Sequence, residues 1–372
     1  MNHNLAEKNL RKFFHHTAVV LNVIVAIPLF ISIISVYFNP SKYWIMAFPG
    51  LGFPYFLLIN MVFIIYWIIR LKLTFLISTI AILCGIHHIK NFVQLTCNND
   101  PAGVPSGTIS VMSYNVRLFD IYEWSGTKKA PQKIISFVMK EKPDILCLQE
   151  FVSGNTTIVP TFDTLPDFGK LNNQYYVPLQ TGKKKLSYGI VTFSNYPIVN
   201  KGFIRFEHTN NFAIFTDLEI NYDTLRVYNV HLQSVHFETK NYRFLDSISL
   251  NYDEYQIKGI KDIGRKLKKA YILRSKQADS IAAHISKSPW PVIVCGDFND
   301  TPVSYAYTTL RKNLNDAFVQ SGCGIEYTYP GKFSSFRIDY ILHSKNINSY
   351  HYRTSKIDYS DHYPVCCEFI IK

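Results

Sequence analysis

The chain has few charged residues for its size. Asp, Glu, Lys and Arg make up only 18% of the 372 residues, whereas 48% are hydrophobic and 15% are aromatic. This composition argues against a wholly soluble protein, and the hydrophobic excess lies in the first hundred residues. The length allows one large domain or two ordinary ones, with a sizeable core.

Acidic residues are the scarcer kind of charge. The chain has 27 Asp and Glu against 39 Lys and Arg, which gives a formal net charge of +12. A basic balance suits a protein that works near polyanions such as nucleic acid, anionic lipid or phosphorylated metabolites. Charge alone does not choose among these classes.

Cysteine pairs with C-x-x-C spacing are absent from the sequence. Most of the seven cysteines sit in apolar runs such as ILCLQ and VIVCGD. We therefore expect buried free thiols, and not a disulfide or zinc framework. The seven are Cys84, Cys97, Cys147, Cys295, Cys323, Cys366 and Cys367.

A small-residue cleavage site is also lacking after the first apolar run. That run, TAVVLNVIVAIPLFISIISVYF, extends from Thr17 to Phe38 without a charge. It meets the roughly 20 residues that a helix needs to cross a bilayer, and it is longer than the apolar region of a signal peptide, which is about 7 to 15 residues. The run therefore predicts a transmembrane helix.

Two further apolar runs follow, FLLINMVFIIYWII and LTFLISTIAILCGI, of which the last is short. Basic residues precede the first span and stand between the second and third at Arg70 and Lys72, whereas the loop between the first and second holds only Lys42. Because positive charge marks the cytoplasmic side, three spans would put the rest of the chain outside the cytoplasm. We expect an integral protein of a bacterial-type inner or plasma membrane. Without the third span, the rest of the chain would return to the cytoplasm.

The composition divides the chain into a membrane segment at 1–96 with about three transmembrane helices, a linker at 97–108 rich in turn formers, and a domain at 109–372. In the domain, short β-rich runs alternate with helical patterns, which predicts an α/β fold with many strands. Several strands end in a polar residue, where α/β sheets place their sites, although each alone also fits a turn. These residues are Asn115, Glu150, His231, Asp297 with Asn299, and Asp339.

Oxygen-bearing side chains among them fit the needs of phosphoester hydrolysis. That reaction needs a cation on the phosphate oxygens, donors for the developing charge, and a base for water. Mg²⁺ takes only one or two protein carboxylates, so Glu150 with help from Asn115 would suffice. Asp297 and Asn299 stand at i and i+2 in GDFND and share a face if the segment is extended. One can accept a proton from water while the other donates to phosphate.

The C-terminal motifs RIDY and SDH offer a carboxylate and an imidazole. A carboxylate on one ring nitrogen raises the basicity of the other. Asp339 paired with His362 would therefore suit acid–base work or the binding of a phosphate oxygen. A surface aspartate and a core histidine are the alternative interpretation.

Six motifs occur in one order along the chain: SYNVR, LQE, VHLQS, GDFND, RIDYIL and SDHYPV. Together they resemble the signature of the endonuclease/exonuclease/phosphatase superfamily, which includes pancreatic-type deoxyribonuclease and neutral sphingomyelinases. The resemblance covers residues 109–372. It implies a catalytic domain with a four-layer α/β sandwich, in which two packed mixed β-sheets are flanked by helices, preceded here by transmembrane helices.

The resemblance also implies roles for individual residues. Glu150 would bind Mg²⁺, with Mn²⁺ as a possible substitute, and Arg117 would either contact phosphate or form a structural salt bridge. The catalytic group would be His231, Asp297, Asn299, Asp339 and His362. The metal group would be Glu150, Asn115 and Asp361, and the phosphate contacts would come from Arg117, Asn299 and His231.

We therefore expect a membrane-anchored, divalent-metal-dependent phosphoesterase that hydrolyses a phosphodiester of nucleic acid or of a phospholipid head group by metal-assisted attack of water. The alternative is a noncatalytic membrane protein that uses the same fold to bind a phosphorylated ligand. The expected partners are the lipid bilayer and a phosphate-containing substrate, and the sequence points to no obligate protein partner.

A basic segment at 251–285 separates the His231 motif from GDFND. Its periodic Ile and Leu mark one apolar helical face, and its Lys and Arg could face phosphates of lipid or nucleic acid. We favour a solvated helix packed on the sheet. Tyr188, Tyr242 and Tyr255 could stack bases or line a groove, but we favour core packing for them.

Overall fold

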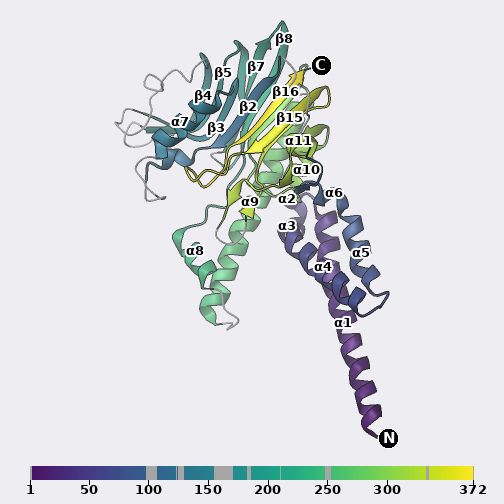
Figure 1. The fold of residues 1–372 in the computed structure, drawn as a ribbon. Coiled ribbons are helices and arrows are strands. Elements are labelled where there is room, and N and C mark those ends of the chain that lie inside the picture. Colours follow the sequence, from purple (N-terminus) through teal and green to yellow (C-terminus); the bar gives the residue numbers. More distant parts are fainter. Residues whose placement is uncertain are drawn as a thin grey trace.

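The computed structural model describes residues 2–97, 107–122, 124, 130–154, 171–181, 186–209, 211–247, 253–331 and 335–371. The linker predicted at 97–108 falls mostly outside these residues. Figure 1 shows two parts, a sandwich of sheets and a helical bundle that extends from one end of it. The N-terminus lies at the far end of the bundle, and the C-terminus lies on the sandwich.

Two six-stranded sheets form the sandwich. The first has the order β15-β16-β2-β3-β5-β4, and the second has the order β10-β14-β9-β8-β7-β6. The first sheet comprises β2 (Ile109–Asn115), β3 (Ile145–Gly154), β4 (Asn173–Thr181), β5 (Leu186–Ser194), β15 (Ile347–Thr354) and β16 (Val365–Ile371). The second comprises β6 (Ile198–Arg205), β7 (Phe212–Ile220), β8 (Asp223–His231), β9 (Val292–Asp297), β10 (Leu314–Asp316) and β14 (Asp339–Ser344).

Helices cover the outer faces of both sheets. The helix α7 (Ala130–Glu141) crosses between the parallel strands β2 and β3. The parallel pair β8 and β9 is joined through α8 (Thr239–Asp246) and α9 (Glu254–Ile285). The remaining helices of the domain are α10 (Tyr305–Arg311), α11 (Ala317–Ser321) and the short η2 (Arg117–Asp120). This arrangement confirms the predicted four-layer sandwich of two mixed sheets flanked by helices.

The alternation of side chains along each strand builds the layers. In β2, Val111 enters the core between the two sheets, whereas Met112 and Tyr114 point to the opposite face and pack under α7 with Ile134. A third cluster lies between the second sheet and the helices α9 and α10. It contains Tyr228 of β8, Ile281 of α9 and Leu310 of α10. Each sheet is therefore buried on both faces over much of its area, which leaves the strand ends for chemistry.

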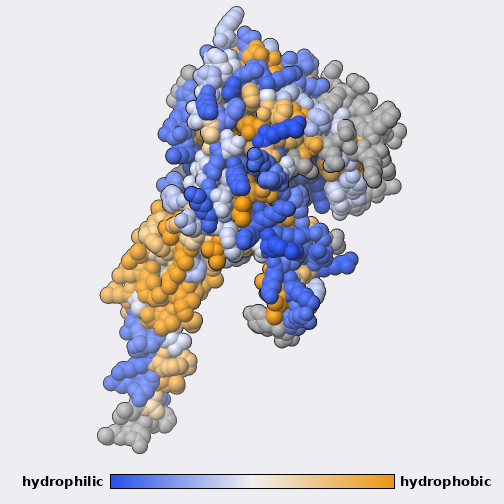
Figure 2. Space-filling view, turned by 180° about the vertical axis from the view of Figure 1, so that it is seen from behind, coloured by the Kyte–Doolittle hydropathy of each residue, from blue (hydrophilic) through white to orange (hydrophobic). Residues whose placement is uncertain are grey.

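The predicted membrane segment forms the helical bundle, which consists of α1 (Asn2–Ser35), α2 (Pro40–Tyr43), η1 (Trp44–Met46), α3 (Ala47–Leu51), α4 (Phe53–Ile69), α5 (Phe75–Cys84) and α6 (Ile86–Ile89). Among the described residues, one helix is long and apolar enough to cross a membrane, from Ala6 to Ser35. A second span exists if the pair Pro40–Leu51 and Phe53–Ile69, bent by 47°, counts as one. The expected third span corresponds to α5, which has only 10 residues. Figure 2 shows that this segment carries a broad apolar surface.

Three polar side chains meet at the centre of this bundle. Ser78 of α5 places its Oγ 2.8 Å from Asn22 Oδ1 of α1 and 2.7 Å from Asn60 Oδ1 of α4. All three side chains are fully buried. Polar contacts of this kind hold helices together where the surroundings are apolar, so α5 belongs to the same bundle as the longer helices.

The bundle is joined to the sandwich by specific contacts. Asn39 donates from Nδ2 to Asp279 of α9 at 2.9 Å, and Phe48 packs against Tyr271 of α9 with ring centroids 5.6 Å apart. The two-residue strands β1 (Val93–Gln94) and β11 (Gly324–Ile325) pair across the junction. A second small sheet, β12 (Tyr329–Pro330) with β13 (Ser335–Phe336), lies nearby in the sequence.

The prediction for cysteine was wrong for one pair. Cys97 and Cys323 form a disulfide with Cα atoms 4.7 Å apart, between the end of the membrane segment and the sandwich. Sequence spacing could not reveal it, because the two residues are 226 positions apart and meet only through the pairing of β1 with β11. The buried free thiols are Cys147, Cys295, Cys366 and Cys367, as expected, while Cys84 is free and exposed.

Candidate active site

The predicted site residues gather at one end of the sandwich because of strand register. In the second sheet, Asp297 at the end of β9 is paired directly with His231 on one side and with Asp339 on the other. In the first sheet, Asn115 ends β2 opposite Gln149 of β3, so that Glu150 follows at the same edge. The ends of β2 and β9 meet where the two sheets pack together, and there Asn115 Nδ2 donates to Asp297 Oδ2 across the sandwich at 3.1 Å.

Unusual backbone conformations aim two of these side chains. Glu150 has φ +50°, and Asn299 has φ +53°, values in the left-handed region that non-glycine residues rarely occupy. The register of β3 with β5 shifts between Leu148 and Phe151, around Glu150. Gly296, just before Asp297, has φ +144°, and a Cβ there would lie 1.9 Å from the Val230 carbonyl oxygen. Only glycine therefore allows β9 to approach β8 at this point.

Asn115 bridges the two acidic groups of the site. Its Nδ2 lies 3.4 Å from Glu150 Oε1 as well as 3.1 Å from Asp297 Oδ2, and its Oδ1 accepts the Arg117 backbone N–H at 3.0 Å. In this arrangement the amide nitrogen, and not the oxygen, faces the carboxylates. Asn115 thus positions Glu150 and Asp297, and the predicted role as an oxygen ligand would require its side chain to turn over.

His231 is buried beside both carboxylates without a hydrogen-bond partner among the described residues. Its Nε2 lies 3.7 Å from Glu150 Oε1 and 3.7 Å from Asp297 Oδ2, and neither ring nitrogen is satisfied. Burial lowers the pKa of His231, so the ring is neutral at neutral pH. Buried polar atoms are seldom left unpaired, which makes this imidazole a position where a ligand atom can bind.

Asp339 and His362 form the predicted pair. His362 Nδ1 lies 2.9 Å from Asp339 Oδ2, and its Nε2 points toward Asp297 Oδ2 at 3.7 Å. Burial alone would lower the pKa of His362, but the Asp339 and Asp297 carboxylates raise it well above 6.5. The ring is therefore an imidazolium that can donate a proton or a hydrogen bond to an anion.

Asp297 lies at the centre of the cluster and is almost completely enclosed. Burial raises the pKa of its carboxyl to about 6, although the neighbouring His362 works against this rise. Asn299 donates to it twice, from the backbone N–H at 2.7 Å and from Nδ2 at 3.0 Å. The Asn299 Nδ2 also donates to the Leu232 carbonyl oxygen at 3.1 Å. Both amide protons of Asn299 are thus engaged, so this side chain orients Asp297 and does not present its N–H groups to a phosphate.

Arg117 and Asp361 pair with each other at the mouth of the site. Their Nε and Oδ2 atoms are 3.2 Å apart, and both side chains are about one-third exposed, at 29% and 33%. The Arg117 guanidinium also lies over the Trp124 ring, 4.9 Å from its centroid. Of the two predicted roles for Arg117, the structure shows the salt bridge. Asp361 also interacts electrostatically with Glu150. The pKa of Glu150 is raised first by its own burial and second by the negative charge of Asp361.

The acidic groups fit a divalent cation. Glu150 is 32% exposed at the mouth, and negative charge on Asp361 raises the pKa of Glu150, so a cation between them would relieve the repulsion. A hard ion that keeps most of its waters requires only one or two such carboxylates. Asp297, Asp339 and His362 also bring ligand-type atoms within 4.8 Å of one another. We consider that cluster less suited to a metal, because an imidazolium repels one.

Buried residues to which the sequence analysis gave no role support the site from below. Gln149 Nε2 donates to Asn229 Oδ1 at 2.7 Å, and Asn229 in turn donates to the Val191 carbonyl oxygen at 2.8 Å, which ties the two sheets together beneath the carboxylates. Tyr329 packs edge-on against His362 with ring centroids 5.1 Å apart. The polar Gln and Asn within the apolar runs ILCLQE and VYNVH were the available signal.

The basic segment has two different parts. Its second half packs on the sheet as expected, with Ala278 and Ile281 buried, and Arg274 lies 3.2 Å from Asp300 in a buried ion pair. Its first half projects from the sandwich (Figure 1). The expectation of core packing for the tyrosines was wrong for Tyr242 and Tyr255, which are 37% and 55% exposed.

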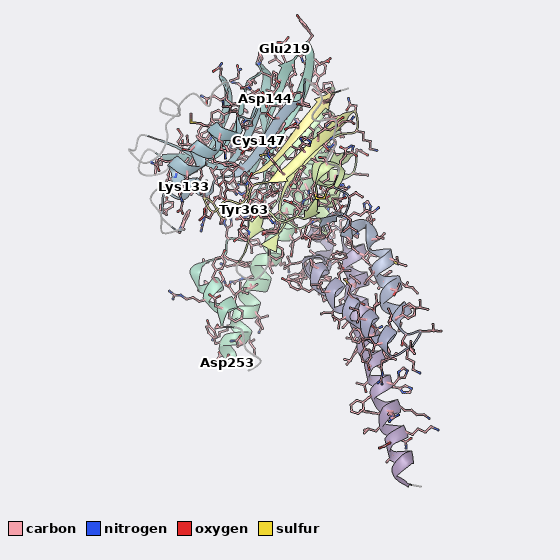
Figure 3. The ribbon with its side chains drawn as sticks, in the orientation of Figure 1. Lys133, Asp144, Cys147, Glu219, Asp253 and Tyr363 are labelled. Carbon is pink, nitrogen blue, oxygen red and sulfur yellow. A yellow bond between two sulfur atoms is a disulfide. The ribbon has the colours of Figure 1, made fainter. Side chains whose placement is uncertain are left out.

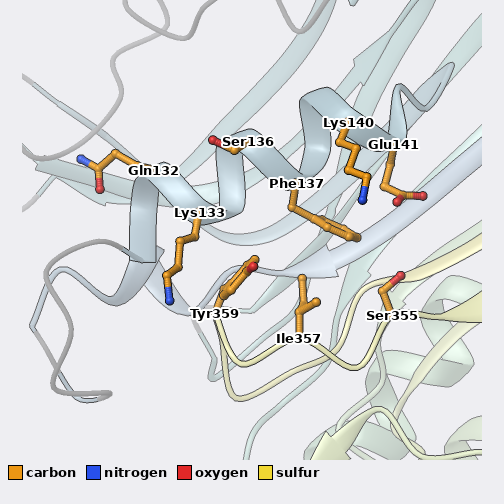
Figure 4. A pocket seen from close by; sticks show the side chains of 9 residues that line it. All are labelled: Gln132, Lys133, Ser136, Phe137, Lys140, Glu141, Ser355, Ile357 and Tyr359. Carbon is orange, nitrogen blue, oxygen red and sulfur yellow. The ribbon is translucent and has the colours of Figure 1, made fainter.

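A groove elsewhere on the domain lies between α7 and the segment that leads to Ser360 (Figure 4). It has a volume of about 870 Å³ and is open to solvent. None of the predicted site residues lines it. Its lining residues are Gln132, Lys133, Ser136, Phe137, Lys140, Glu141, Ser355, Ile357 and Tyr359.

Comparison with solved structures supports the fold. An endonuclease/exonuclease/phosphatase from Beutenbergia cavernae matches with a TM-score of 0.50 and 15% identity, over 71% of this chain and 72% of that one. The human nocturnin catalytic domain matches with a TM-score of 0.49 and 22% identity, over 71% and 95% of the two chains. A humanized D. rerio TDP2 matches with a TM-score of 0.49 and 18% identity, over 71% and 100%. At 15% identity the likeness to the Beutenbergia cavernae protein extends to the fold alone.

Comparison with protein families separates the two parts of the chain. Residues 11–92 match a domain of unknown function, and no curated protein matches the chain. Residues 112–362 match the model of the endonuclease/exonuclease/phosphatase family. The chain therefore belongs to the endonuclease/exonuclease/phosphatase family, whose members are generally hydrolases acting on phosphoester bonds.

Proposed function

We propose that the protein is a membrane-anchored phosphodiesterase that depends on a divalent metal and hydrolyses a phosphodiester of nucleic acid or of a phospholipid head group. One observation carries the proposal. The Nε2 of His231, which has no hydrogen-bond partner within the described part of the chain, lies 3.7 Å from the carboxylates of both Glu150 and Asp297, and the imidazolium of His362 lies on the other side of Asp297. This arrangement provides a base, a proton donor and room for a phosphate oxygen in one place.

The reaction follows from the charges of these groups. As water adds to phosphorus, Asp297 accepts one proton, which its pKa of about 6 favours more than that of an ordinary carboxylate. His362 stabilises the charge that develops on phosphate or donates a proton to the leaving oxygen. The ester P–O bond breaks, and the products are a phosphate monoester and an alcohol. His231 contacts a phosphate oxygen, while Asn299 and Asp339 hold their partners in position.

Glu150 would be the principal metal ligand, with Asp361 close to it and Asn115 as a supporting group. Mg²⁺ suits these oxygen donors, and Mn²⁺ is a possible substitute. When bound, the metal would neutralise charge on the phosphate oxygens. The repulsion between the carboxylates of Glu150 and Asp361 supports this assignment. Burial is the largest cause of the raised pKa of Glu150, and the charge of Asp361 is the second.

We propose three spans and a domain outside the cytoplasm. The buried contacts of Ser78 with Asn22 and Asn60 support α5 as a third membrane helix. An odd number of spans puts the domain on the side opposite the basic N-terminus. The disulfide between Cys97 and Cys323 supports the same side, because disulfides persist in oxidising compartments. Reporter fusions after Cys97 test this, and activity of a reporter that works only in the cytoplasm would refute it.

The alternative function is a noncatalytic membrane protein that binds a phosphorylated ligand with the same site. Purified full-length protein in detergent, assayed on bis-p-nitrophenyl phosphate with Mg²⁺ or Mn²⁺, separates the two. We expect hydrolysis that EDTA abolishes and that Glu150→Ala and His362→Ala each reduce by roughly 10² to 10⁴-fold. Lys345→Glu, at an exposed turn beyond β14, is the matched control. Absence of hydrolysis, with no effect of Glu150→Ala, would favour the binding protein.

A further inference from the structure

The catalytic end of the sandwich faces the same way as the membrane helices. Figure 3 labels Tyr363, next to His362, at the end of the sandwich nearest the bundle, and Glu219 at the opposite end. Strand direction agrees with this view. Glu219 lies near the end of β7, opposite the start of the antiparallel strand β8, so β8 runs away from Glu219 and ends at His231 in the site. The mouth of the site is therefore turned toward the bilayer that surrounds the membrane segment.

This orientation is fixed by contacts at the junction. Arg337 donates from Nη1 to the Asn91 carbonyl oxygen at 2.9 Å and from Nη2 to Asp316 at 2.6 Å, and it is fully buried. Lys268 of α9 lies over the Trp44 ring, 4.2 Å from its centroid. With the disulfide and the contacts of Asn39 and Phe48, these interactions join the bundle to several elements of the sandwich, which restricts rotation between them.

A helical arm projects from the sandwich beside the bundle. We define the arm as α8 (Thr239–Asp246) together with residues 254–268 of α9. Asn241 donates to Asp262 at 2.8 Å and Lys266 donates to Glu238 at 2.8 Å, which ties α8 to α9. The tip of the arm, labelled Asp253 in Figure 3, is directed away from the sandwich on the side of the bundle, and Figure 2 shows open space between arm and bundle.

Two exposed isoleucines of the arm lie on the face that continues toward the bundle. Ile257 and Ile260 are 42% and 52% exposed. At about 100° per residue, they share a helical face with Lys268 and Tyr271, which contact Trp44 and Phe48 of the membrane segment. An exposed apolar stripe that leads to a membrane segment indicates contact with the bilayer.

Basic residues flank that stripe. Between Glu254 and Lys269, six Lys and Arg residues outnumber two acidic ones, and Lys261 and Lys269 have no ion-pair partner among the residues that the structure describes. Such charges do not enter the hydrocarbon core. An apolar stripe with a basic flank instead suits the layer of anionic head groups.

The arm also borders the catalytic mouth. Burial and then the Tyr242 hydroxyl of α8 raise the pKa of Tyr329, and Tyr329 packs against His362. The arm thus lies next to His362, the side chain that would meet a phosphate.

We propose that the arm rests on the anionic head-group layer of the protein's own membrane and that the site takes a phosphodiester carried by a membrane lipid. This inference depends on the proposed function and narrows its substrate. Water would cleave one P–O ester bond of the lipid's phosphodiester, which gives a phosphate monoester and an alcohol. A nucleic acid would have to enter between the mouth and the bilayer, which makes it the less favoured substrate.

The test uses full-length protein reconstituted in vesicles of phosphatidylcholine, phosphatidylglycerol and sphingomyelin. We measure the rate of lipid hydrolysis divided by the rate on bis-p-nitrophenyl phosphate in the same sample. Ile257→Ser combined with Ile260→Ser, and separately Lys261→Glu, should lower this ratio roughly tenfold. The matched controls at the far end of the sandwich, Tyr222→Ser and Lys345→Glu, should leave it unchanged.

Each outcome has one meaning. If bis-p-nitrophenyl phosphate or DNA is hydrolysed but no lipid is, the lipid inference is wrong while the proposed function stands. If lipid is hydrolysed but the arm variants leave the ratio unchanged, the role of the arm is wrong while the proposed function stands. If nothing is hydrolysed and Glu150→Ala has no effect, the proposed function itself fails. A separate binding measurement is quenching of a tryptophan by lipids with brominated acyl chains. The introduced tryptophan should add quenching beyond that of the four native tryptophans for Ile260→Trp and not for Tyr222→Trp, and equal added quenching in the two variants would overturn the placement of the arm.

Discussion

Glu326 is a carboxylate buried at the junction between the membrane segment and the sandwich. Only 9% of the residue is exposed. Its backbone N–H donates to the Phe92 carbonyl oxygen at 3.0 Å, and its carboxyl accepts a hydrogen bond from Thr354 Oγ1. Burial raises the pKa of Glu326 from 4.5 to about 7. Glu326→Gln removes the titrating group and keeps its shape and much of its hydrogen bonding.

The magnitude follows from the two pKa values. The difference between 4.5 and about 7, at about 1.4 kcal/mol for each pKa unit, corresponds to about 3 kcal/mol. Because the folded-state pKa of this acid is raised, the folded protein binds more protons, so the ionised group lowers stability above pH 7. That cost disappears as the pH falls from about 7 toward 4.5. Glu326→Gln should therefore raise the free energy of unfolding by about 3 kcal/mol at pH 8 and hardly change it near pH 4.5.

Denaturant unfolding of full-length protein in detergent, followed by fluorescence at both pH values, measures this difference. Glu219→Gln is the matched control, since Glu219 is exposed at the far end of the sandwich, and it should change stability at neither pH. A destabilised Glu326→Gln protein at pH 8, or a stabilisation of equal size at both pH values, would refute the reasoning. Either result would mean that hydrogen-bond partners or water offset the free-energy cost of burying the ionised carboxylate of Glu326 in the folded protein.

Two further predictions concern the active site. Asp339→Asn removes the charge that holds His362 as an imidazolium, and it should lower kcat for bis-p-nitrophenyl phosphate by roughly 10 to 100-fold, the value of a charged hydrogen bond. It should also move the alkaline limb of the pH–rate profile to lower pH, and an unchanged profile would contradict the pairing. Gly296→Ala should destabilise the domain by roughly 2 to 4 kcal/mol, because its Cβ would meet the Val230 carbonyl oxygen. Denaturant unfolding measures this, and Gly264→Ala, where a Cβ has open space, is its control.

The fold class could be predicted from the sequence because the periodicities of both strands and helices are clear in this chain. Apolar runs that alternate with helical patterns predicted an α/β domain, and β2 and β3 follow that pattern closely. The six motifs in family order predicted the sandwich and the family, which the match to residues 112–362 confirms. Strand pairing was not predicted, since register depends on contacts between residues far apart in the chain.

The site residues were named from strand ends, but their partners came from the tertiary structure. Sequence spacing suggested that Asp297 and Asn299 share a face, so that one accepts a proton from water while the other donates to a phosphate. The positive φ of Asn299 instead turns its amide toward Asp297 and the Leu232 carbonyl oxygen. Arg117 was open to two roles until its salt bridge with Asp361 appeared. Local motifs identify chemical groups, whereas the direction of each group depends on backbone angles that the motif does not specify.

By itself, the sequence determined that an apolar segment precedes an α/β domain of this family and which side chains carry charge at its strand ends. Those properties depend on composition, order and periodicity, all of which are local. Only the tertiary structure decided that Cys97 meets Cys323, that the first half of α9 projects as an arm, and that the end of the sandwich with the candidate site faces the N-terminal helical bundle. These features depend on how distant segments pack at the junction, where buried contacts such as that of Arg337 with Asn91 fix one orientation of the two parts.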